Sequence, residues 1–365
     1  MTPIIKRAAG SDQFKVTLAI AGAHLAEKFG SSAGEIVQEN IAIDYAIATK
    51  PAGESKEQMI AEISLLLTEF TAVLRREKPD YVFLLGDRYE TYAAAMAAFF
   101  FGIPIAHSGG GNKTAGGCID DTVRHLITKL ASLHFVTCEE NAANIRRLGE
   151  ENWRICNSGS PVVETLLTEK LYSKQELQEM LAINWKLPLI LFTQHPISTA
   201  PEKAGSQIRE SLSALAELGL PTVVTYPNAD AGSDRIIQEY KAFDQSENLF
   251  FHKHLGRKLY LSVMKHCAVV VGNSSSGLLE TPVFHVPAVN IGDRQKGRVR
   301  STNVIDAPHD KEAIKAAVKK AIFDEAFIQQ VKHCPNPFGN GETSKIILET
   351  LAEKRTCPAL LTKTL

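Results

Sequence analysis

The sequence predicts an α/β protein with two domains, each built on a doubly wound parallel sheet. Short apolar runs bounded by Gly and Pro alternate with longer amphipathic stretches, the pattern of strands buried on both faces and of the helices that cover them. This series breaks after Pro161 and resumes at Pro188, and a length of 365 residues fits two domains. Two open sheets that face each other place a ligand at the carboxyl ends of their strands.

Eight strands are expected, four in each half of the chain. They cover Phe14–Ile20, Tyr81–Leu85, Ile103–Ala106, Leu133–Thr137, Leu189–Thr193, Thr222–Tyr226, Cys267–Val271 and Ala288–Ile291. Apolar residues recur at helical spacing from Met59 to Leu74, and Pro79 ends that helix. The charged helical segment Val162–Lys186 joins the domains, and the helix Ser344–Ala352 crosses back onto the first domain.

The domain boundaries follow from this series. We expect an N-terminal domain at 1–165 with the acid/base residues, a nucleotide-binding domain at 166–338, and the returning C-terminal helix in 339–365. No internal repeat is visible at a fixed period.

Composition and charge exclude several classes of protein. With 40 Lys+Arg and 41 Asp+Glu, the chain lacks the excess of basic residues that is typical of a nucleic-acid-binding protein, so no nucleic-acid partner is expected. No apolar run reaches the roughly 18 residues of a membrane helix, and no signal peptide is recognisable. Six cysteines without a CxxC pair indicate reduced thiols in a cytoplasmic protein. His252 and His254 lack a nearby third ligand, so no metal site is expected.

The turn after the strand at 81–85 offers the first candidate site residues. Gly86 permits a tight turn there, and Asp87 and Arg88 follow it at the carboxyl end of the strand. The alternative is that Asp87 only caps the next helix. Capping and chemistry are compatible, so Asp87 stays a candidate for both.

The densest polar cluster is the loop at 107–117, which begins at His107 and contains five glycines. Its glycines allow close approach of the backbone to a ligand. A P-loop is excluded because Asn112 stands before Lys113, where that motif requires Gly. Asp120, Asp121 and Arg124 follow on an expected helix. They are acid/base and binding candidates. Alternatively, the two acids are ordinary first-turn residues that the helix dipole favours, and Arg124 pairs with Asp120.

The sequence GNSSSG at 272–277 is the expected anion site of the second half. A helix that begins there offers backbone amides and hydroxyls to a diphosphate, or it is an ordinary capped helix start. A serine-hydrolase elbow is excluded because Ser276 occupies a position where that motif needs Gly. The candidate binding residues are Asn273, Ser274, Ser275 and Gly277.

Two more loops of the second half carry candidate residues. His195 follows the strand at 189–193, where it binds phosphate, transfers a proton or simply lies at the surface. Arg294 and Arg298 follow the strand at 288–291. They bind phosphate or carboxylate oxygens, or they belong to a solvent-exposed run of charged residues.

Taken in order, these clusters resemble the UDP-N-acetylglucosamine 2-epimerase family, and most of all its hydrolysing branch. The resemblance rests on GDRYE at 86–90, IDDTVRHLITKLASLHFV at 119–136, GSP at 159–161, HP at 195–196, YPNADAGS at 226–233, GNSSSGLLETP at 272–282 and VPAVNIGDRQKGR at 286–298. It covers nearly the whole chain, and several motifs in a fixed order are more specific than any one of them.

The resemblance implies two Rossmann-like domains of the GT-B type that face a central cleft. It implies a UDP-sugar substrate bound between them, no NAD or catalytic metal, and a homo-oligomer, either dimer or tetramer. In the family reaction the C2 proton and UDP leave to give a glycal. The hydrolysing branch then adds water with inversion at C2, which yields UDP and a free sugar such as N-acetylmannosamine or a diacetamido relative. These products serve the synthesis of sialic, legionaminic and other nonulosonic acids.

The resemblance also implies roles for single residues. Asp87 and Asp120 match acids of the family, and Asp120 would help with proton transfer. Glu280 would bind the ribose hydroxyls. The residues expected to bind substrate or nucleotide are Arg88, Arg124, His195, Asn273, Ser274, Ser275, Gly277, Glu280 and Arg294.

The start of the chain departs from the family pattern. The family opens with a strand and a G-T-R-type turn before a helix, whereas this chain starts at Met1–Lys6, inside that helix. We therefore expect the first strand of the N-terminal domain and its substrate-binding Arg to be missing. A missing central strand exposes two sheet edges, so reduced stability and weak activity are expected. Restoration of an upstream strand should raise both the melting temperature and turnover.

The glycine-rich loop is the second departure. The family loop reads H-I-E-G-G-E, and here Gly109 and Asn112 replace the two Glu residues. Since Gly cannot accept a proton, His107 or Asp120 takes over as the base at C2, or the substrate differs, or activity is lost. A non-hydrolysing epimerase, an inactive nucleotide-sugar binder and a GT-B glycosyltransferase are the alternative functions.

Overall fold

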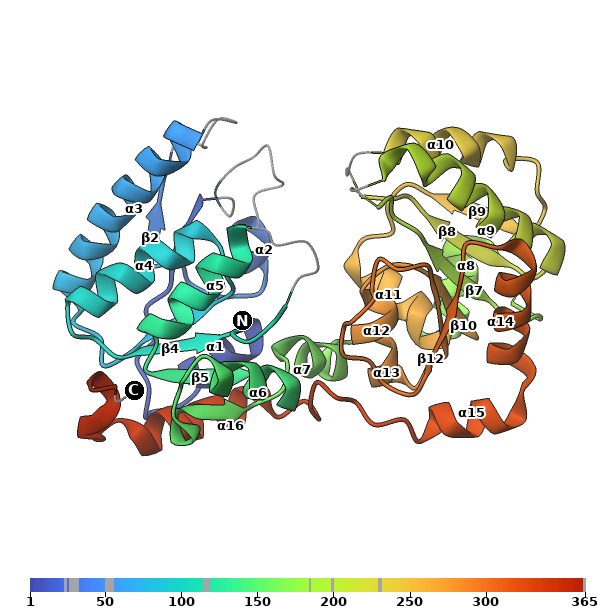
Figure 1. Cartoon of the computed structure of the whole chain (residues 1–365). Coiled ribbons are helices and arrows are strands. Elements are labelled where there is room, and N and C mark those ends of the chain that lie inside the picture. Colours follow the sequence, from blue (N-terminus) through green and yellow to red (C-terminus); the bar gives the residue numbers. More distant parts are fainter. Residues whose placement is uncertain are drawn as a thin grey trace. The chain divides into compact units, whose positions relative to one another are not determined.

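The computed structural model describes residues 1–22, 25, 33–49, 56–113, 119–183, 185–197, 200–228 and 232–363. The chain divides into two compact units (Figure 1). Unit 1 combines Met1–Thr165 with Phe338–Leu365, and unit 2 is Leu166–Pro337. Both units consist of parallel sheets covered by helices, which confirms the predicted α/β class.

Unit 1 contains a four-stranded sheet and a separate two-stranded one. The larger has the order β3 (Val82–Leu85), β4 (Ile105–Ser108), β5 (Leu133–Val136) and β6 (Ile155–Asn157), and the smaller pairs β1 (Ala19–Ala21) with β2 (Tyr45–Ile47). The first helix, α1 (Thr2–Ala9), precedes all of these strands. The expectation that the family's first strand is missing before α1 stays a prediction.

Helices cover both faces of the four-stranded sheet of unit 1. On one face α1 and α16 (Thr343–Lys354) pack over residues such as Leu133 and Phe135, while α3 (Lys56–Glu77), α4 (Tyr89–Phe100) and α5 (Ile119–Leu130) cover the other. The remaining helices are α2 (Ala33–Gln38), α6 (Glu139–Arg147) and α7 (Pro161–Thr168), the last of which crosses the unit boundary. The sheet is therefore buried on both sides, as apolar strands require.

Unit 2 is a single six-stranded parallel sheet between two layers of helices. Its strand order is β12 (Val304–Ala307), β11 (Ala288–Ile291), β10 (Val269–Gly272), β7 (Ile190–Thr193), β8 (Thr222–Thr225) and β9 (Leu249–His252). One layer comprises α9 (Ala204–Leu218), α10 (Ser233–Ala242), α14 (Lys311–Phe323) and α15 (Glu325–Lys332). The other layer comprises α8 (Lys174–Leu181), α11 (Arg257–His266) and α13 (Thr281–Phe284).

Alternate residues of the central strands point to opposite layers of unit 2. Ile190 and Phe192 pack with one layer, whereas Leu189 and Leu191 pack with the other. This alternation explains why an unbroken apolar run predicts a central strand.

Four strands went unpredicted, namely β2, β6, β9 and β12. Each lies at a sheet edge and is only partly buried, so it is not covered on both faces as the predicted central strands are. The prediction of a strand at Phe14–Ile20 was largely wrong, because β1 begins at Ala19. Phe14 and Val16 instead pack against the core beneath α1 and α16.

No helix in the described residue ranges has the length and apolar character to cross a bilayer.

Candidate functional site

Arg124, on α5, joins three segments of unit 1. Its Nε donates to Asp87 Oδ2 at 2.9 Å, its Nη1 donates to the carbonyl of Asn112 at 2.8 Å, and it forms further hydrogen bonds to Asp87 and Asp121. The side chain is only 5% exposed. Burial acts to lower the pKa of Arg124, but the two carboxylates outweigh it and raise that pKa. A fork of this kind holds the turn after β3 and the loop after β4 at fixed positions.

The predicted pairing of Arg124 with Asp120 was wrong. Arg124 pairs instead with Asp121, three residues before it on the helix. Asp120 is half-buried and forms no hydrogen bond or ion pair with any residue that the structure describes. Neighbouring acids on α5 therefore differ: Asp121 pairs with Arg124, whereas Asp120 has no such partner within the described part of the chain.

Asn112 fastens the glycine-rich loop to α6. It donates from Nδ2 to the carbonyl of Gly109 at 3.1 Å, and its Oδ1 accepts from Asn141 at 2.7 Å. Asn144 donates to the carbonyl of Gly111, where a Cβ would lie 2.2 Å from the Asn141 carbonyl oxygen. Asn112, the residue that stands where the family has a Glu, thus holds the glycine-rich loop against α6. The remainder of the predicted loop, 114–117, lies outside the described residues.

His107 is fully buried beneath the turn that precedes Asp87. Its Nε2 lies 2.9 Å from the carbonyl oxygen of Gly86, so Nε2 carries the proton and donates. Nδ1 is buried without a hydrogen-bond partner among the described residues. Burial lowers the pKa of His107 to about 4, which leaves the ring neutral at pH 7. Its burial argues against the predicted role of accepting a proton from substrate and favours support of the turn.

Replacement of His107 with Gln should weaken the acid sensitivity of folding. Between pH 6.5, the ordinary His value, and about pH 4, the unfolded chain binds a proton that the folded ring refuses. The free energy of unfolding of the wild type therefore falls as the pH is lowered through this window. His107→Gln retains an amide donor for Gly86 but does not titrate. Urea unfolding at pH 7, 5.5 and 4.5 measures the difference, and equal slopes for both proteins would contradict it.

Arg88 lies next to this cluster but points toward solvent. Its guanidinium is 59% exposed and donates from Nε to Glu90 at 3.2 Å. It also lies over the ring of Tyr89, 5.5 Å from the centroid. The structure therefore separates Arg88 from the buried contacts of Asp87, although the two residues are adjacent in sequence.

In unit 2, Asn273 joins the loops that follow β10 and β7. Its Oδ1 accepts from the backbone N–H of His195 at 2.7 Å, and its Nδ2 donates to the carbonyl of His195 at 2.8 Å. The N–H of Asn228, after β8, donates to His195 Nδ1 at 3.0 Å. Because Nδ1 accepts, a neutral His195 carries its proton on Nε2 and presents a donor there. Asn228 was not a predicted site residue.

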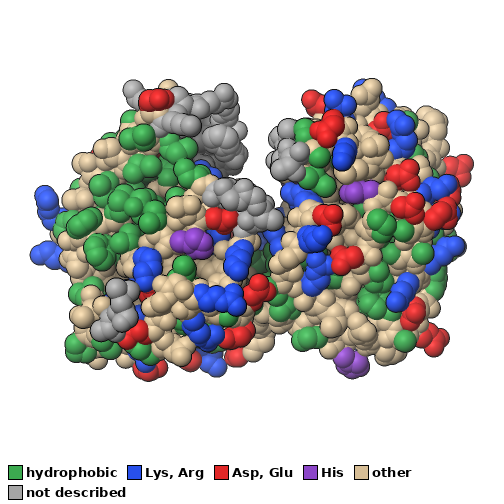
Figure 2. Space-filling view, in the orientation of Figure 1, with side chains coloured by type: hydrophobic (Ala, Val, Ile, Leu, Met, Phe, Trp, Pro, Cys, Tyr) green, Lys and Arg blue, Asp and Glu red, His purple; other side chains and the backbone are tan. Residues whose placement is uncertain are grey.

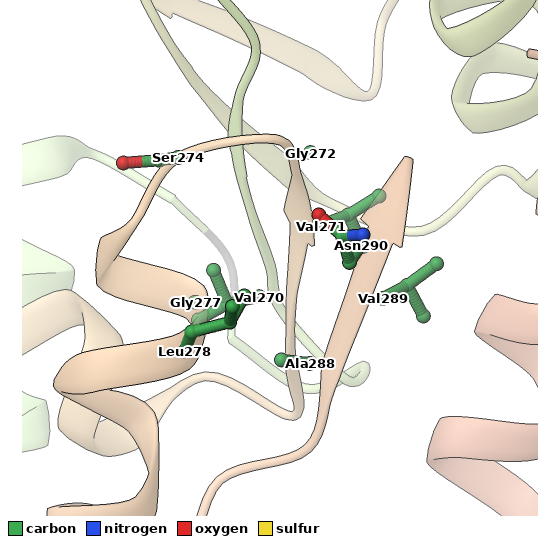
Figure 3. Close-up of a pocket in the computed structure, with 9 residues that line it drawn as sticks. All are labelled: Val270, Val271, Gly272, Ser274, Gly277, Leu278, Ala288, Val289 and Asn290. Carbon is green, nitrogen blue, oxygen red and sulfur yellow. The ribbon is translucent and has the colours of Figure 1, made fainter. Parts of the chain in front are cut away.

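Gly272 ends β10 in a conformation that side chains rarely adopt, at a φ of +133°. A Cβ at this position would lie 1.9 Å from the carbonyl oxygen of Thr193 on β7. Only glycine therefore lets the chain turn from β10 into the Asn273–Ser275 loop. The pocket in Figure 3 lies beside this turn, between β10, β11 and the start of α12 (Ser276–Leu279), with Ser274 and Gly277 in its lining.

Gly272→Ala is expected to destabilise unit 2 by about 2 kcal/mol, from backbone strain and the contact with Thr193. Gly219→Ala is the matched control. Gly219 also has a positive φ, but its Cβ would meet nothing within 4 Å, so the cost there is about 1 kcal/mol. Thermal melting of both variants measures the difference. Equal melting temperatures would show that the Thr193 contact is harmless.

A row of hydroxyl groups supports the serines of the GNSSSG loop. Ser276 donates from both its N–H and its Oγ to Ser274 Oγ, at 3.4 and 3.0 Å. Ser276 Oγ in turn lies 2.8 Å from the hydroxyl of Tyr260 on α11, which lies 3.4 Å from Thr193 Oγ1. Ser274 Oγ accepts two hydrogen bonds, so its own hydrogen is available to a ligand. The sequence did not indicate Tyr260, because it lies inside an ordinary amphipathic helix.

The other predicted residues of unit 2 lie near the same strand ends. Arg294 donates to the backbone carbonyl of Asn273 at 3.1 Å. Ser275 precedes α12 and is half-buried, and Gly277 lies buried in its first turn. Glu280 follows α12, and burial raises its pKa. The structure thus brings together His195, Asn273 and Arg294 through direct hydrogen bonds.

Comparison with known proteins gives a consistent family assignment. Residues 6–352 match the model of a family described as UDP-N-acetylglucosamine 2-epimerase. A relative from Campylobacter jejuni, named GDP/UDP-N,N'-diacetylbacillosamine 2-epimerase (hydrolyzing), is 36% identical over 78% of this chain and 75% of its own. The polysialic acid biosynthesis protein P7 of Escherichia coli is 34% identical over 89% of this chain and 83% of its own.

A solved structure shares the fold. The UDP-GlcNAc 2-epimerase from Neisseria meningitidis, determined with bound UDP-GlcNAc, aligns with a TM-score of 0.77 over 97% of this chain and 96% of its own. At 20% identity this likeness supports the fold alone. The predicted two-domain Rossmann-like architecture of the GT-B type is confirmed.

Proposed function

The chain belongs to the UDP-N-acetylglucosamine 2-epimerase family, and we propose that it is a hydrolysing nucleotide-sugar 2-epimerase. The substrate is UDP-N-acetylglucosamine or a 2,4-diacetamido relative, and the products are UDP and the free 2-epimeric sugar, such as N-acetylmannosamine. Support comes from the C. jejuni relative, whose name includes "hydrolyzing". The name of the E. coli relative supports a place in nonulosonic acid synthesis. A cytoplasmic location is part of the same proposal.

The observation that carries the proposal is that the three acids Asp87, Asp120 and Asp121 of unit 1 differ in their ion-pair partners. Arg124 pairs with both Asp87 and Asp121, while Asp120 has no ion-pair or hydrogen-bond partner among the described residues. An unneutralised carboxylate is suited to take up a proton. Since His107 is buried, Asp120 is the better candidate for the base that replaces the missing family Glu.

The proposed reaction has two steps. Asp120 removes the proton from C2 of the sugar, the C–H electron pair forms the C1=C2 double bond, and the C1–O bond to UDP breaks. Water then adds its oxygen to C1 of the glycal and releases one proton, and C2 receives a proton on the face opposite to the one that Asp120 deprotonated. Asp120 loses the proton that it took in the first step to solvent. The sum is one UDP-sugar and one water converted to UDP and a free sugar.

The donors of unit 2 are proposed to stabilise the departing diphosphate. His195, Ser274, Ser275 and the amide of Gly277 supply hydrogen-bond donors, and Arg294 supplies a positive charge. Such fixed donors stabilise a developing negative charge. Glu280 is proposed to accept hydrogen bonds from the ribose hydroxyls.

One experiment separates this function from the alternatives. The protein is incubated with UDP-N-acetylglucosamine or a UDP-2,4-diacetamido sugar, and UDP and sugar are followed by NMR. Release of UDP with free 2-epimeric sugar supports the proposal. Formation of UDP-N-acetylmannosamine indicates a non-hydrolysing epimerase, and saturable binding without turnover indicates an inactive binder. Transfer only after an acceptor is added indicates a glycosyltransferase.

Self-association is also part of the proposal. Hydrophobic side chains gather on one face of unit 1, over α3 and α4 (Figure 2). The exposed large hydrophobic residues of α3, α4 and α5 include Ile60, Leu65, Phe99, Phe100 and Leu126. Phe100 is 83% exposed, which is unusual for Phe. Light scattering after chromatography should show that Phe100→Glu reduces the mass from an oligomer toward a monomer, and an unchanged mass would place the interface elsewhere.

A further inference from the structure

We infer that Gln295 is a positioning residue for nucleotide binding, acting through Asn273; this inference rests on the proposed function. Gln295 follows β11 and is 1% exposed. Its Nε2 donates to the backbone carbonyl of Asn273 at 2.8 Å. The side-chain amide of Asn273 in turn pairs with both backbone groups of His195. Two buried side-chain amides, those of Gln295 and Asn273, thus connect the loop after β11 to His195, two strands away.

The connection follows the order of strands in the sheet. β11, β10, β7 and β8 are consecutive neighbours, and hydrogen bonds join their carboxyl-end loops in the same order. Gln295 contacts Asn273, Asn273 contacts His195, and the Asn228 amide contacts the His195 ring. A displacement of the Asn273 backbone therefore moves both the GNSSSG loop and His195, the groups proposed to bind the diphosphate.

Arg294 and Gln295 share one acceptor, which gives Gln295 a distinct task. Arg294 Nη1 also donates to the Asn273 carbonyl, at 3.1 Å. Arg294 is half-buried and charged, so an anionic ligand competes with that carbonyl for its guanidinium. Gln295 is buried and neutral, and it keeps the carbonyl satisfied when Arg294 turns to the ligand. Without Gln295, binding of the anion leaves this carbonyl short of a donor.

Gln295→Met is the variant that tests this role. Met has a similar length and no hydrogen-bond donor. Gln295 Oε1 is buried without a hydrogen-bond partner in the described part of the chain, so Met also removes an unsatisfied oxygen and the fold should lose little stability. We expect the Kd for UDP, measured by calorimetry, and the KM for UDP-sugar to rise about tenfold, the effect of one lost hydrogen bond. We expect kcat to fall by a smaller factor than KM rises, because the donors for the departing diphosphate are displaced while the acids of unit 1 are untouched.

Two controls distinguish positioning from loss of stability. Gln330→Met removes the same kind of bond, a Gln amide that donates to the Thr302 carbonyl at 2.7 Å, on the exposed side of α15. Asn248→Ala removes two amide bonds, to Leu215 and Leu220, at the opposite end of the β8 strand. Both should leave the Kd for UDP unchanged, even where Asn248→Ala lowers the melting temperature more than Gln295→Met does.

A second readout is independent of catalysis. The backbone N–H of His195 donates to Asn273 Oδ1, so its hydrogen exchange should accelerate in Gln295→Met and stay slow in Gln330→Met. Unchanged exchange and an unchanged Kd for UDP would overturn the inference. Failure of the wild type to bind UDP would contradict the proposed function instead, and exchange at His195 would still test the connection from Gln295.

Discussion

Asp120→Asn is expected to lower kcat for release of free sugar by about 10²–10⁴-fold, while UDP binds as in the wild type. The amide cannot take the C2 proton, whereas the nucleotide is bound by groups of unit 2. Asn has almost the same size as Asp, and Asp120 supports no described hydrogen bond, so folding should be unaffected. Production of UDP and free sugar by NMR, together with the Kd for UDP, measures both effects.

His107→Gln is the matched control for Asp120→Asn. His107 was the other candidate for the relocated base, but its ring is fully buried and donates to the Gly86 carbonyl. The Gln variant should therefore retain turnover within about tenfold of the wild type, since it disturbs only the support of the turn. If Asp120→Asn releases UDP at the wild-type rate while His107→Gln does not, the assignment of the base is reversed. If both are unimpaired, neither residue is the base.

Arg124→Met is expected to reduce the free energy of unfolding by about 3 kcal/mol or more. The substitution leaves the carboxylates of Asp87 and Asp121 without the cation that satisfies them, and removal of one partner from a buried ion pair is strongly destabilising. It also releases the Asn112 carbonyl and with it the glycine-rich loop. Urea unfolding measures the stability, and turnover should be lost as well because Asp87 and the loop are no longer held.

A surface pair of the same unit provides the control for Arg124. Arg146 donates to Glu139 at 2.6 Å, but both side chains are well exposed, so Arg146→Met should cost at most about 1 kcal/mol. The double variant Arg124→Met/Asp87→Asn should recover part of the stability that Arg124→Met loses, because a neutral amide is less costly to leave unpaired. Equal losses for Arg124→Met and Arg146→Met would show that the buried cluster contributes no more than a surface pair.

The α/β class and the central strands follow from the sequence because of a simple physical constraint. A strand such as β7 is covered on both faces, so Ile190, Leu191 and Phe192 are all apolar, and this short unbroken run is visible in the sequence without any partner strand. Edge strands such as β6 and β9 have a half-exposed pattern that also fits a loop. They become recognisable only once the neighbouring strand is in place.

The candidate site residues follow from the sequence for a related reason. Polar and glycine residues directly after a buried strand have few structural tasks, and several such clusters in a fixed order identify a family. Asp87, His195 and the GNSSSG loop became candidates in this way, and Asp120 became one through its match to a family motif. Their sequence neighbours also reveal departures, such as Asn112 in place of a family Glu, because the motif around them is intact.

The partners of these residues were decided by the tertiary structure alone. Spacing along α5 allowed Arg124 to pair with either acid, and the turn after β3 and the loop after β4 determined that it holds Asp87 and Asp121. The contact of Gln295 with Asn273 depends on β11 and β10 being neighbours, and that of Asn273 with His195 on β10 lying beside β7, although 78 residues separate them. Strand order is set by packing across the whole sheet, so local sequence cannot reveal which loops meet at its edge.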